Sequence, residues 1–164
     1  MLASAGIAGT IGRALLLVGF ICSVFGAFAA ITGVRNNEPR VIRLVSRFAT
    51  MAFVAAVGAF AVMEYAMITR DFSLAYVQKV GSWSTPALYN FAAVWSALEG
   101  SILMWVLILA GYTVAVCFWM RKRLSESLAA LAMAVMMIVL AFFFLVSFFP
   151  ANPFAAGAPG VLDG

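Results

Sequence analysis

The chain has 164 residues, is 66% hydrophobic, has a mean hydropathy of +1.11 and carries a net charge of +4. A soluble domain of this composition would expose too much apolar surface to water, so the chain is expected to be an integral membrane protein. The positive charge is concentrated in two short segments, which is typical of membrane topology and argues against a nucleic-acid partner.

The expected fold class is an all-α integral membrane protein with four transmembrane helices, and we expect residues 1–164 to form a single membrane domain. Four apolar runs are each about as long as the roughly 20 residues that cross a bilayer. They predict spans at about 14–34, 48–69, 100–120 and 127–149.

The first run follows Arg13 and ends in a basic cluster instead of a small-residue cleavage site, so we expect a retained span and not a signal peptide. Small residues recur along it at helical spacing, for example Gly19, Ser23 and Gly26. Such a stripe favours close approach of another helix, but small residues are also common in membrane helices, and both interpretations stay open.

The two basic segments predict the orientation of the chain. Residues 35–47 and 121–127 hold seven of the ten Lys and Arg residues. The positive-inside rule places both segments in the cytoplasm. The N-terminus, the segment 71–99 and the C-terminal tail 150–164 are then expected on the outer side.

Residues for metal or acid–base chemistry are scarce. The chain has no histidine, and its two cysteines, Cys22 and Cys117, lie far apart inside predicted spans. Neither a metal-ligand spacing nor a catalytic constellation is present, so we predict no metal site and no catalytic residue.

Polar, charged and aromatic residues mix in the segment 71–99, between the second and third spans. Asp71 is predicted to cap a short interfacial helix whose apolar face, including Phe72 and Tyr76, is turned toward the bilayer. Gly81 is expected to end this helix.

A second helix is predicted to start at Thr85 and Pro86, an N-cap followed by proline at the first helical position. We expect it to run on into the third span. Helical spacing then places four side chains on one face: Trp95, Leu98, Ile102 and Trp105.

Glu99 is the carboxylate next to this aromatic face. It is tolerated near a membrane if it meets the positive end of a broken helix, or Arg70 or Lys79. Two interpretations stay open: an outward aromatic surface for a planar hydrophobic ligand, and an interfacial aromatic belt with one paired carboxylate.

The order and spacing of these residues resemble the N-terminal region of the CcmF-type cytochrome c haem lyases. The motifs that carry the resemblance are Asp71-Phe72-Ser73, Tyr76-Val77, Pro86, Tyr89, Trp95, Glu99-Gly100-Ser101, Trp105, Asn152-Pro153-Phe154 and Asp163-Gly164. Leu98, Asn90 and Ala151 depart from residues that are frequent in the family. The resemblance covers essentially the whole chain but only about the first quarter of the family, before its tryptophan-rich signature loop and its haem-ligating histidines.

The resemblance implies an N-terminal module or split subunit of a haem lyase in the bacterial inner membrane. Such a module would help to bind and position haem for covalent attachment to apocytochrome c at the outer face. The implied cofactor is haem, for which this chain offers no histidine axial ligand. The implied partners are the rest of the lyase, a haem chaperone, apocytochrome c with its thiol-presenting partner, and the lipid bilayer. Whether the chain is a complete split subunit or a fragment stays open.

By the same resemblance, a set of residues forms the wall or support of a haem site: Trp95, Glu99, Gly100, Ser101, Trp105, Tyr76 and Tyr89. Asp71, Phe72 and Pro86 belong to the outer-face segment. We do not expect the chain to be catalytic alone.

Two other classes of function stay open on the residues themselves. A small proton-coupled exporter of lipophilic cations would use Glu64 or Glu99 deep in an oligomeric bundle. A structural subunit would only hold other membrane proteins through its small-residue stripes.

Overall fold

The computed structural model describes residues 6–36, 39–83, 86–123 and 126–160. Within these ranges it is helical, with one isolated pair of bridged residues and no longer strand, which confirms the predicted fold class. The helices are α1 (Ile7–Arg35), α2 (Pro39–Ile68), α3 (Ala75–Val80), α4 (Ala87–Ala93), α5 (Leu98–Trp119) and α6 (Ser127–Phe148).

Four of these helices, α1, α2, α5 and α6, are long and apolar enough to cross a membrane. The first two are longer than the sequence suggested. α1 starts at Ile7 instead of about residue 14, and α2 starts at Pro39 instead of about residue 48. Proline is compatible with the first turn of a helix, so much of the expected loop 35–47 is helical.

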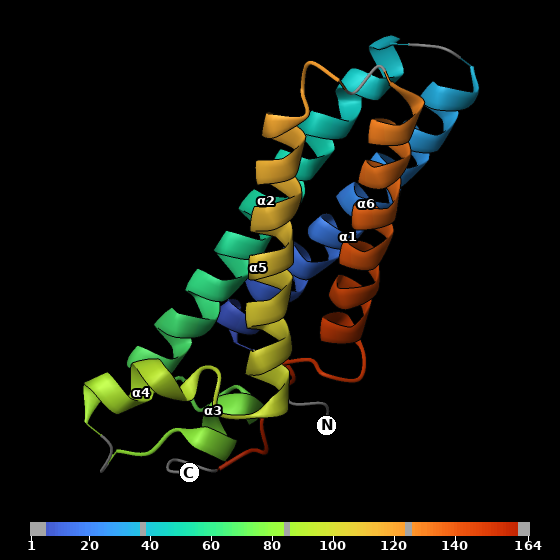
Figure 1. Cartoon of the computed structure of the whole chain (residues 1–164). Coiled ribbons are helices and arrows are strands. Elements are labelled where there is room, and N and C mark those ends of the chain that lie inside the picture. Colours follow the sequence, from blue (N-terminus) through green and yellow to red (C-terminus); the bar gives the residue numbers. More distant parts are fainter. Residues whose placement is uncertain (1–5, 37–38, 84–85, 124–125, 161–164) are drawn as a thin grey trace.

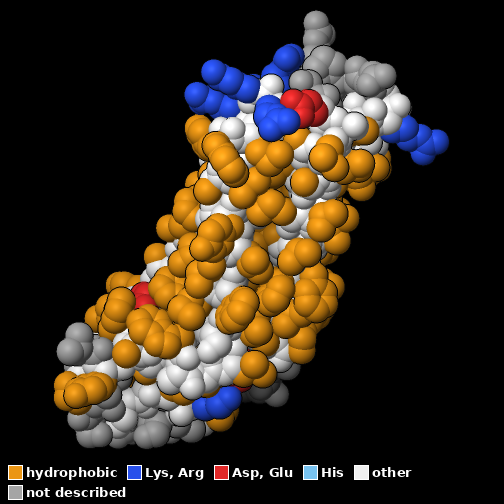
Figure 2. Space-filling view, viewed as in Figure 1, with side chains coloured by type: hydrophobic (Ala, Val, Ile, Leu, Met, Phe, Trp, Pro, Cys, Tyr) orange, Lys and Arg blue, Asp and Glu red, His pale blue; other side chains and the backbone are white. Residues whose placement is uncertain are grey.

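The four long helices form a bundle in which α1 packs against α2 and α6, while α5 packs against α2 and α6 (Figure 1). One end of this bundle carries α3, α4, the turn at residues 94–97 and the tail at residues 150–160, which together we term the cap. At the other end, Lys and Arg side chains gather in the space-filling view (Figure 2). The uneven distribution of charge therefore follows the long axis of the molecule.

The small residues of α1 are contact points for large side chains. A Cβ atom added at Gly12 would overlap the ring of Phe154, and one added at Gly19 would overlap the ring of Phe144. At Gly26 it would overlap the end of Met137. The structure therefore supports the helix-packing interpretation of the α1 stripe over a purely compositional one.

Candidate functional site

The short helix α3 is packed into the protein and is not turned toward the bilayer, so the predicted orientation of its apolar face is wrong. Tyr76 is 3% exposed and Val77 is fully buried in the main hydrophobic core. Burial raises the pKa of the Tyr76 hydroxyl, and the nearby Glu99 carboxylate adds to the rise. Tyr76 therefore lies in the hydrophobic core, where it supports the residues around it.

Asp71 does not cap α3, which starts four residues later than its predicted cap. Its Oδ1 instead accepts a hydrogen bond from the Ser73 backbone N–H at 3.2 Å. The delay has a physical cause, because the residues between Asp71 and α3 pair with the tail. Leu74 and Ala156 form an antiparallel bridge, flanked by the hydrogen bonds Ala75 N to Ala155 O (2.9 Å) and Gly157 N to Ser73 O (2.8 Å).

Gln78, which the sequence analysis did not single out, holds the tail on α3. Its Nε2 donates to the carbonyl oxygens of Phe72 (2.7 Å) and Ala158 (2.8 Å). Its Oε1 accepts from the Ala158 N–H at 2.9 Å. The one signal in the sequence was an uncharged polar side chain within a short apolar helix, which does not identify a distant partner.

The Asn152-Pro153-Phe154 motif anchors the same tail on the bundle. Asn152 Oδ1 accepts from the Phe154 N–H at 2.9 Å, and Asn152 Nδ2 donates to Phe148 O at 3.0 Å. The Phe154 ring is fully buried, and Arg13 Nε donates to the Phe154 carbonyl oxygen at 3.0 Å. This motif therefore acts as a structural anchor. Asp163 and Gly164, which also carried the resemblance, lie outside the described residues.

The helix predicted to run from Pro86 into the third span is interrupted, which corrects the expectation of one continuous helix. α4 ends at Ala93, residues 94–97 form a turn, and α5 starts at Leu98. Pro86 is the N-cap of α4 and not its first helical residue as predicted, while Thr85 lies outside the described residues.

Side-chain hydrogen bonds to backbone carbonyls explain this interruption. Tyr76 Oη donates to the carbonyl oxygens of Val94 (2.8 Å) and Ala93 (3.2 Å). Ser101 Oγ donates to Trp95 O at 2.9 Å. These carbonyls would otherwise accept from N–H groups of a continuing helix, so the side chains compete with the helical pattern.

Gly100 is required by the closeness of this turn to α5. A Cβ atom at this position would overlap the Val94 carbonyl oxygen and come within 2.5 Å of Tyr76 Oη. The Glu-Gly-Ser motif therefore has a structural reason at two of its positions: Gly100 admits the turn and Ser101 closes it.

Glu99 lies in the first turn of α5 and forms an ion pair with Lys79 of α3. Lys79 Nζ is 3.0 Å from Oε1 and 3.2 Å from Oε2 of Glu99, with side chains 55% and 26% exposed respectively. One of the pairings predicted from the sequence is thus observed. The carboxylate is also near the positive end of the α5 dipole.

Next to the ion pair is a small cavity of about 240 Å³ between α3, the start of α5 and the tail. Its lining combines the two charged side chains with groups from the tail: Ala75, Tyr76, Lys79, Glu99, Phe149, Pro150, Asn152 and Ala155. A cavity of this size is below the 300–1,000 Å³ typical of sites for drug-sized ligands. It therefore does not enclose a haem.

Aromatic side chains lie exposed around the cap. Trp95 is 38% exposed and meets Phe91 edge-on at 5.6 Å between ring centroids. Tyr89 is exposed on α4, and Trp105 is exposed on α5, where it stacks on Phe143 of α6 at 6.3 Å. Because the helix is interrupted, Trp95 and Trp105 belong to different elements and not to one helical face.

Phe72 brings a further aromatic side chain to the cap. Its ring lies 6.0 Å from that of Trp83, which is also exposed. The Arg70 guanidinium lies 4.8 Å from the centroid of the Trp83 ring, a cation–π geometry. Trp83 was not among the predicted site residues, although its position between two short helices was visible in the sequence.

The described residues include few side chains that could ligate haem iron or a metal ion. No cluster of three or more His, Cys, Asp or Glu side chains suited to a metal occurs among the residues that the structure describes. Cys22 and Cys117 are buried on α1 and α5 as free thiols. The chain offers aromatic contact surface but no histidine ligand, so the residues present do not fit axial ligation of haem.

The chain is similar to known proteins of cytochrome c maturation. No protein-family model matches it. The cytochrome c-type biogenesis protein CcmF of Escherichia coli is 32% identical over 149 residues, which are 91% of this chain and 23% of that protein. CcmF of Pseudomonas aeruginosa is 40% identical over 119 residues, which are 72% of this chain and 17% of that protein.

A solved structure supports the same relation. The cytochrome c haem lyase CcmF superposes with a TM-score of 0.83 and 33% identity, covering 90% of this chain and 24% of that chain. The chain thus spans about a quarter or less of the length of the proteins it matches. The resemblance that the motifs indicated is confirmed.

Proposed function

We propose, from the premise that this chain is a CcmF-type sequence, that it forms the N-terminal module of a cytochrome c haem lyase. In this role it helps to position haem for covalent attachment to apocytochrome c at the outer face of the membrane. The observation that carries the proposal is the structural likeness to CcmF, with a TM-score of 0.83 over 90% of the chain. No comparison supports the alternative of a small exporter of lipophilic cations.

The candidate residues at this end of the bundle form two groups with different tasks. Tyr76, Gly100 and Ser101 are support, because their contacts fix the turn at residues 94–97. Trp95, Tyr89 and Trp105 are contact residues, because their rings are exposed and available to a flat apolar ligand. Glu99 joins the start of α5 to α3 through its ion pair with Lys79.

Haem supplies the vinyl groups that become thioether bonds to the cytochrome. Because this chain has no histidine, the axial ligands come from another part of the lyase. The residues of this chain offer a rigid aromatic surface and exclude water beside it. The contacts of the cap hold that surface in place. We assign no proton transfer or bond formation to them.

In the proposed orientation, the cap and both described ends of the chain lie on the outer side of the membrane. The basic end of the bundle lies in the cytoplasm. The protein is an integral membrane protein of the bacterial inner membrane in this proposal. Its partners are the remaining part of the lyase, a haem chaperone, and apocytochrome c with its thiol-presenting partner.

A maturation assay tests the proposal. A host lacking this segment of its haem lyase is complemented with the wild-type chain or with Trp95→Ala, and covalent haem on cytochrome c is measured by haem staining. We expect restoration by the wild type and a several-fold lower yield for Trp95→Ala at equal membrane levels. The matched control is Trp119→Ala, at an exposed tryptophan at the opposite end of α5. Equal yields for all three chains would contradict the assignment of the cap as a contact surface.

A further inference from the structure

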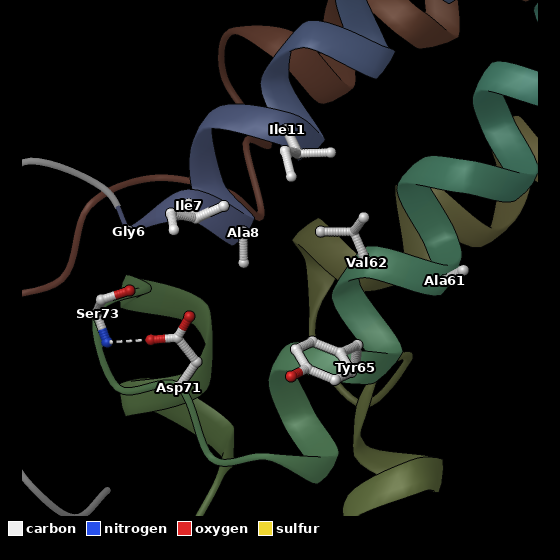
Figure 3. A pocket seen from close by; sticks show the side chains of 9 residues that line it. All are labelled: Gly6, Ile7, Ala8, Ile11, Ala61, Val62, Tyr65, Asp71 and Ser73. Carbon is white, nitrogen blue, oxygen red and sulfur yellow. Dashed lines mark hydrogen bonds between the residues drawn. The ribbon is translucent and has the colours of Figure 1, made fainter.

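A second, larger cavity lies between the first turns of α1 and the last turns of α2, with Asp71 and Ser73 at one end (Figure 3). Its volume is about 660 Å³, within the range of small-molecule sites. Apolar side chains from both helices form its walls, and polar groups lie at one end. The lining residues are Gly6, Ile7, Ala8, Ile11, Ala61, Val62, Tyr65, Asp71 and Ser73.

Lipid headgroups are expected at the level of this cavity. Its walls belong to the terminal turns of two helices that are long and apolar enough to cross a membrane. Ile7, Ile11 and Tyr65 are exposed, so the cavity opens on the surface of the bundle as a groove between α1 and α2. A lipid can therefore reach it from the bilayer without displacing a part of the described chain.

The polar end of the groove carries a carboxylate and a hydroxyl, those of Asp71 and Ser73. Asp71 uses Oδ1 to accept from the Ser73 N–H, while its other oxygen points away from that bond toward α1 (Figure 3). Ser73 Oγ is buried and has no hydrogen-bond partner within the described part of the chain.

The start of α1 reaches the same place. A Cβ atom added at Gly6 would lie 2.6 Å from Ser73 Oγ and 3.7 Å from Asp71 Oδ2. The first turn of a helix has N–H groups without intrahelical acceptors and a partial positive charge. A carboxylate and a positive helix end therefore stand side by side at the mouth of an apolar groove.

We propose that this groove binds one molecule of phosphatidylethanolamine from the surrounding bilayer. Its acyl chain fills the apolar groove, its ammonium group donates to the Asp71 carboxylate, and its phosphate lies at the first turn of α1. The zwitterionic headgroup complements the two charges at the mouth of the groove. The inference is independent of the haem-lyase proposal.

The charge of the groove is also expected to favour phosphatidylethanolamine over other amphiphiles. A haem places two anionic propionates at its polar edge and has no cation to pair with the Asp71 carboxylate, which therefore repels it. Phosphatidylglycerol has no cation for Asp71, and the trimethylammonium group of phosphatidylcholine has no N–H to donate. The site is therefore expected to select the primary ammonium headgroup.

The test measures bound lipid by native mass spectrometry. The purified full chain is stripped of lipid in detergent and titrated with phosphatidylethanolamine, phosphatidylcholine and phosphatidylglycerol of the same acyl chains. We expect one tight phosphatidylethanolamine, with the other two lipids about tenfold weaker. Asp71→Asn is expected to weaken phosphatidylethanolamine about tenfold and to remove the preference.

Filling the groove supplies an independent variant. Ala61→Phe places a ring in the cavity and is expected to abolish the tight site. Val54→Phe is the matched control, because Val54 is exposed on the same helix two turns away and does not line the cavity. Circular dichroism confirms that each variant folds, and Ala8→Phe replaces Ala61→Phe if the latter does not. Equal binding of the three lipids by the wild type, or unchanged binding by both Asp71→Asn and a groove-filling variant, would overturn the proposal.

Discussion

The bundle and the cap are held together by different kinds of interaction. The bundle consists of long apolar helices whose small residues admit large side chains, as at Gly19 against Phe144. The cap consists of short segments whose stability depends on individual side-chain hydrogen bonds to backbone, such as those of Tyr76 and Gln78. Substitutions in the bundle are therefore expected to act through volume, and substitutions in the cap through single polar or steric contacts.

The largest effect is expected at Gly100, where the cap meets α5. Gly100→Ala would drive a methyl group into the Val94 carbonyl and force the turn at residues 94–97 to move. We expect a loss of about 3 kcal/mol of stability, measured by thermal unfolding in detergent. The matched control is Gly111→Ala on the same helix, where a Cβ makes only an ordinary 3.6 Å contact with Phe53. An equal effect of both substitutions would remove the steric explanation.

The next effect is expected at Gln78, which connects α3 to the tail. Gln78→Ala removes three hydrogen bonds to backbone groups, two of them to Ala158, and we expect it to cost about 2 kcal/mol. The specific readout is limited proteolysis, because the tail loses its attachment before the bundle unfolds. A tail cleaved no faster than in the wild type would show that its attachment does not depend on Gln78.

A smaller effect is expected from the Tyr76 hydroxyl. Tyr76→Phe keeps the buried ring but leaves the Val94 and Ala93 carbonyls without this donor, at a cost of about 1.5 kcal/mol. Tyr112→Phe is the control, since Tyr112 is exposed on α5. The comparison uses thermal unfolding, and a Tyr76→Phe midpoint equal to that of the control would mean that the hydroxyl does not stabilise the turn.

The smallest effect is expected at the ion pair between Lys79 and Glu99. Both side chains are partly exposed, so Lys79→Ala is expected to cost less than about 1 kcal/mol and to matter less at high salt. The exchange of the two charges, Lys79→Glu with Glu99→Lys, should recover part of the loss. If Lys79→Ala destabilised the protein more than Gly100→Ala, the ranking of contacts within the cap would be wrong.

How much of this could be predicted from the sequence differs between the two regions. The four spans follow from hydropathy alone, because each is a run of apolar residues of membrane length. The predicted span at 48–69 does not show where α2 starts, because the helix begins before the span, at Pro39, and proline favours the first helical turn.

The cap was harder to predict because its contacts join residues far apart in the chain. Gln78 and Ala158 are 80 residues apart, and no local pattern links them. The interruption between α4 and α5 has no proline within it; it depends on carbonyls engaged by Tyr76 and Ser101. From the sequence, Asp71 could either cap a helix or stabilise a turn. It stabilises a turn because the residues that follow it pair with the tail.

In the candidate site, too, some contacts could be predicted from the sequence and others could not. Lys79 could be predicted as one of the possible partners of Glu99, because a carboxylate near a membrane requires a partner and few cations were close in sequence. The separation of supporting residues from contact residues could not, since exposure of Trp95 and burial of Tyr76 depend on how the cap folds onto the bundle.

The most direct test of the central claim is the visible spectrum of what the chain binds in its host. The chain is expressed with an affinity tag and purified in mild detergent, and the spectrum and the masses of co-purifying proteins are recorded. We predict haem absorbance together with a larger membrane protein rich in histidine and tryptophan. A colourless preparation without any cytochrome c maturation protein would contradict the claim that this chain is part of a haem lyase.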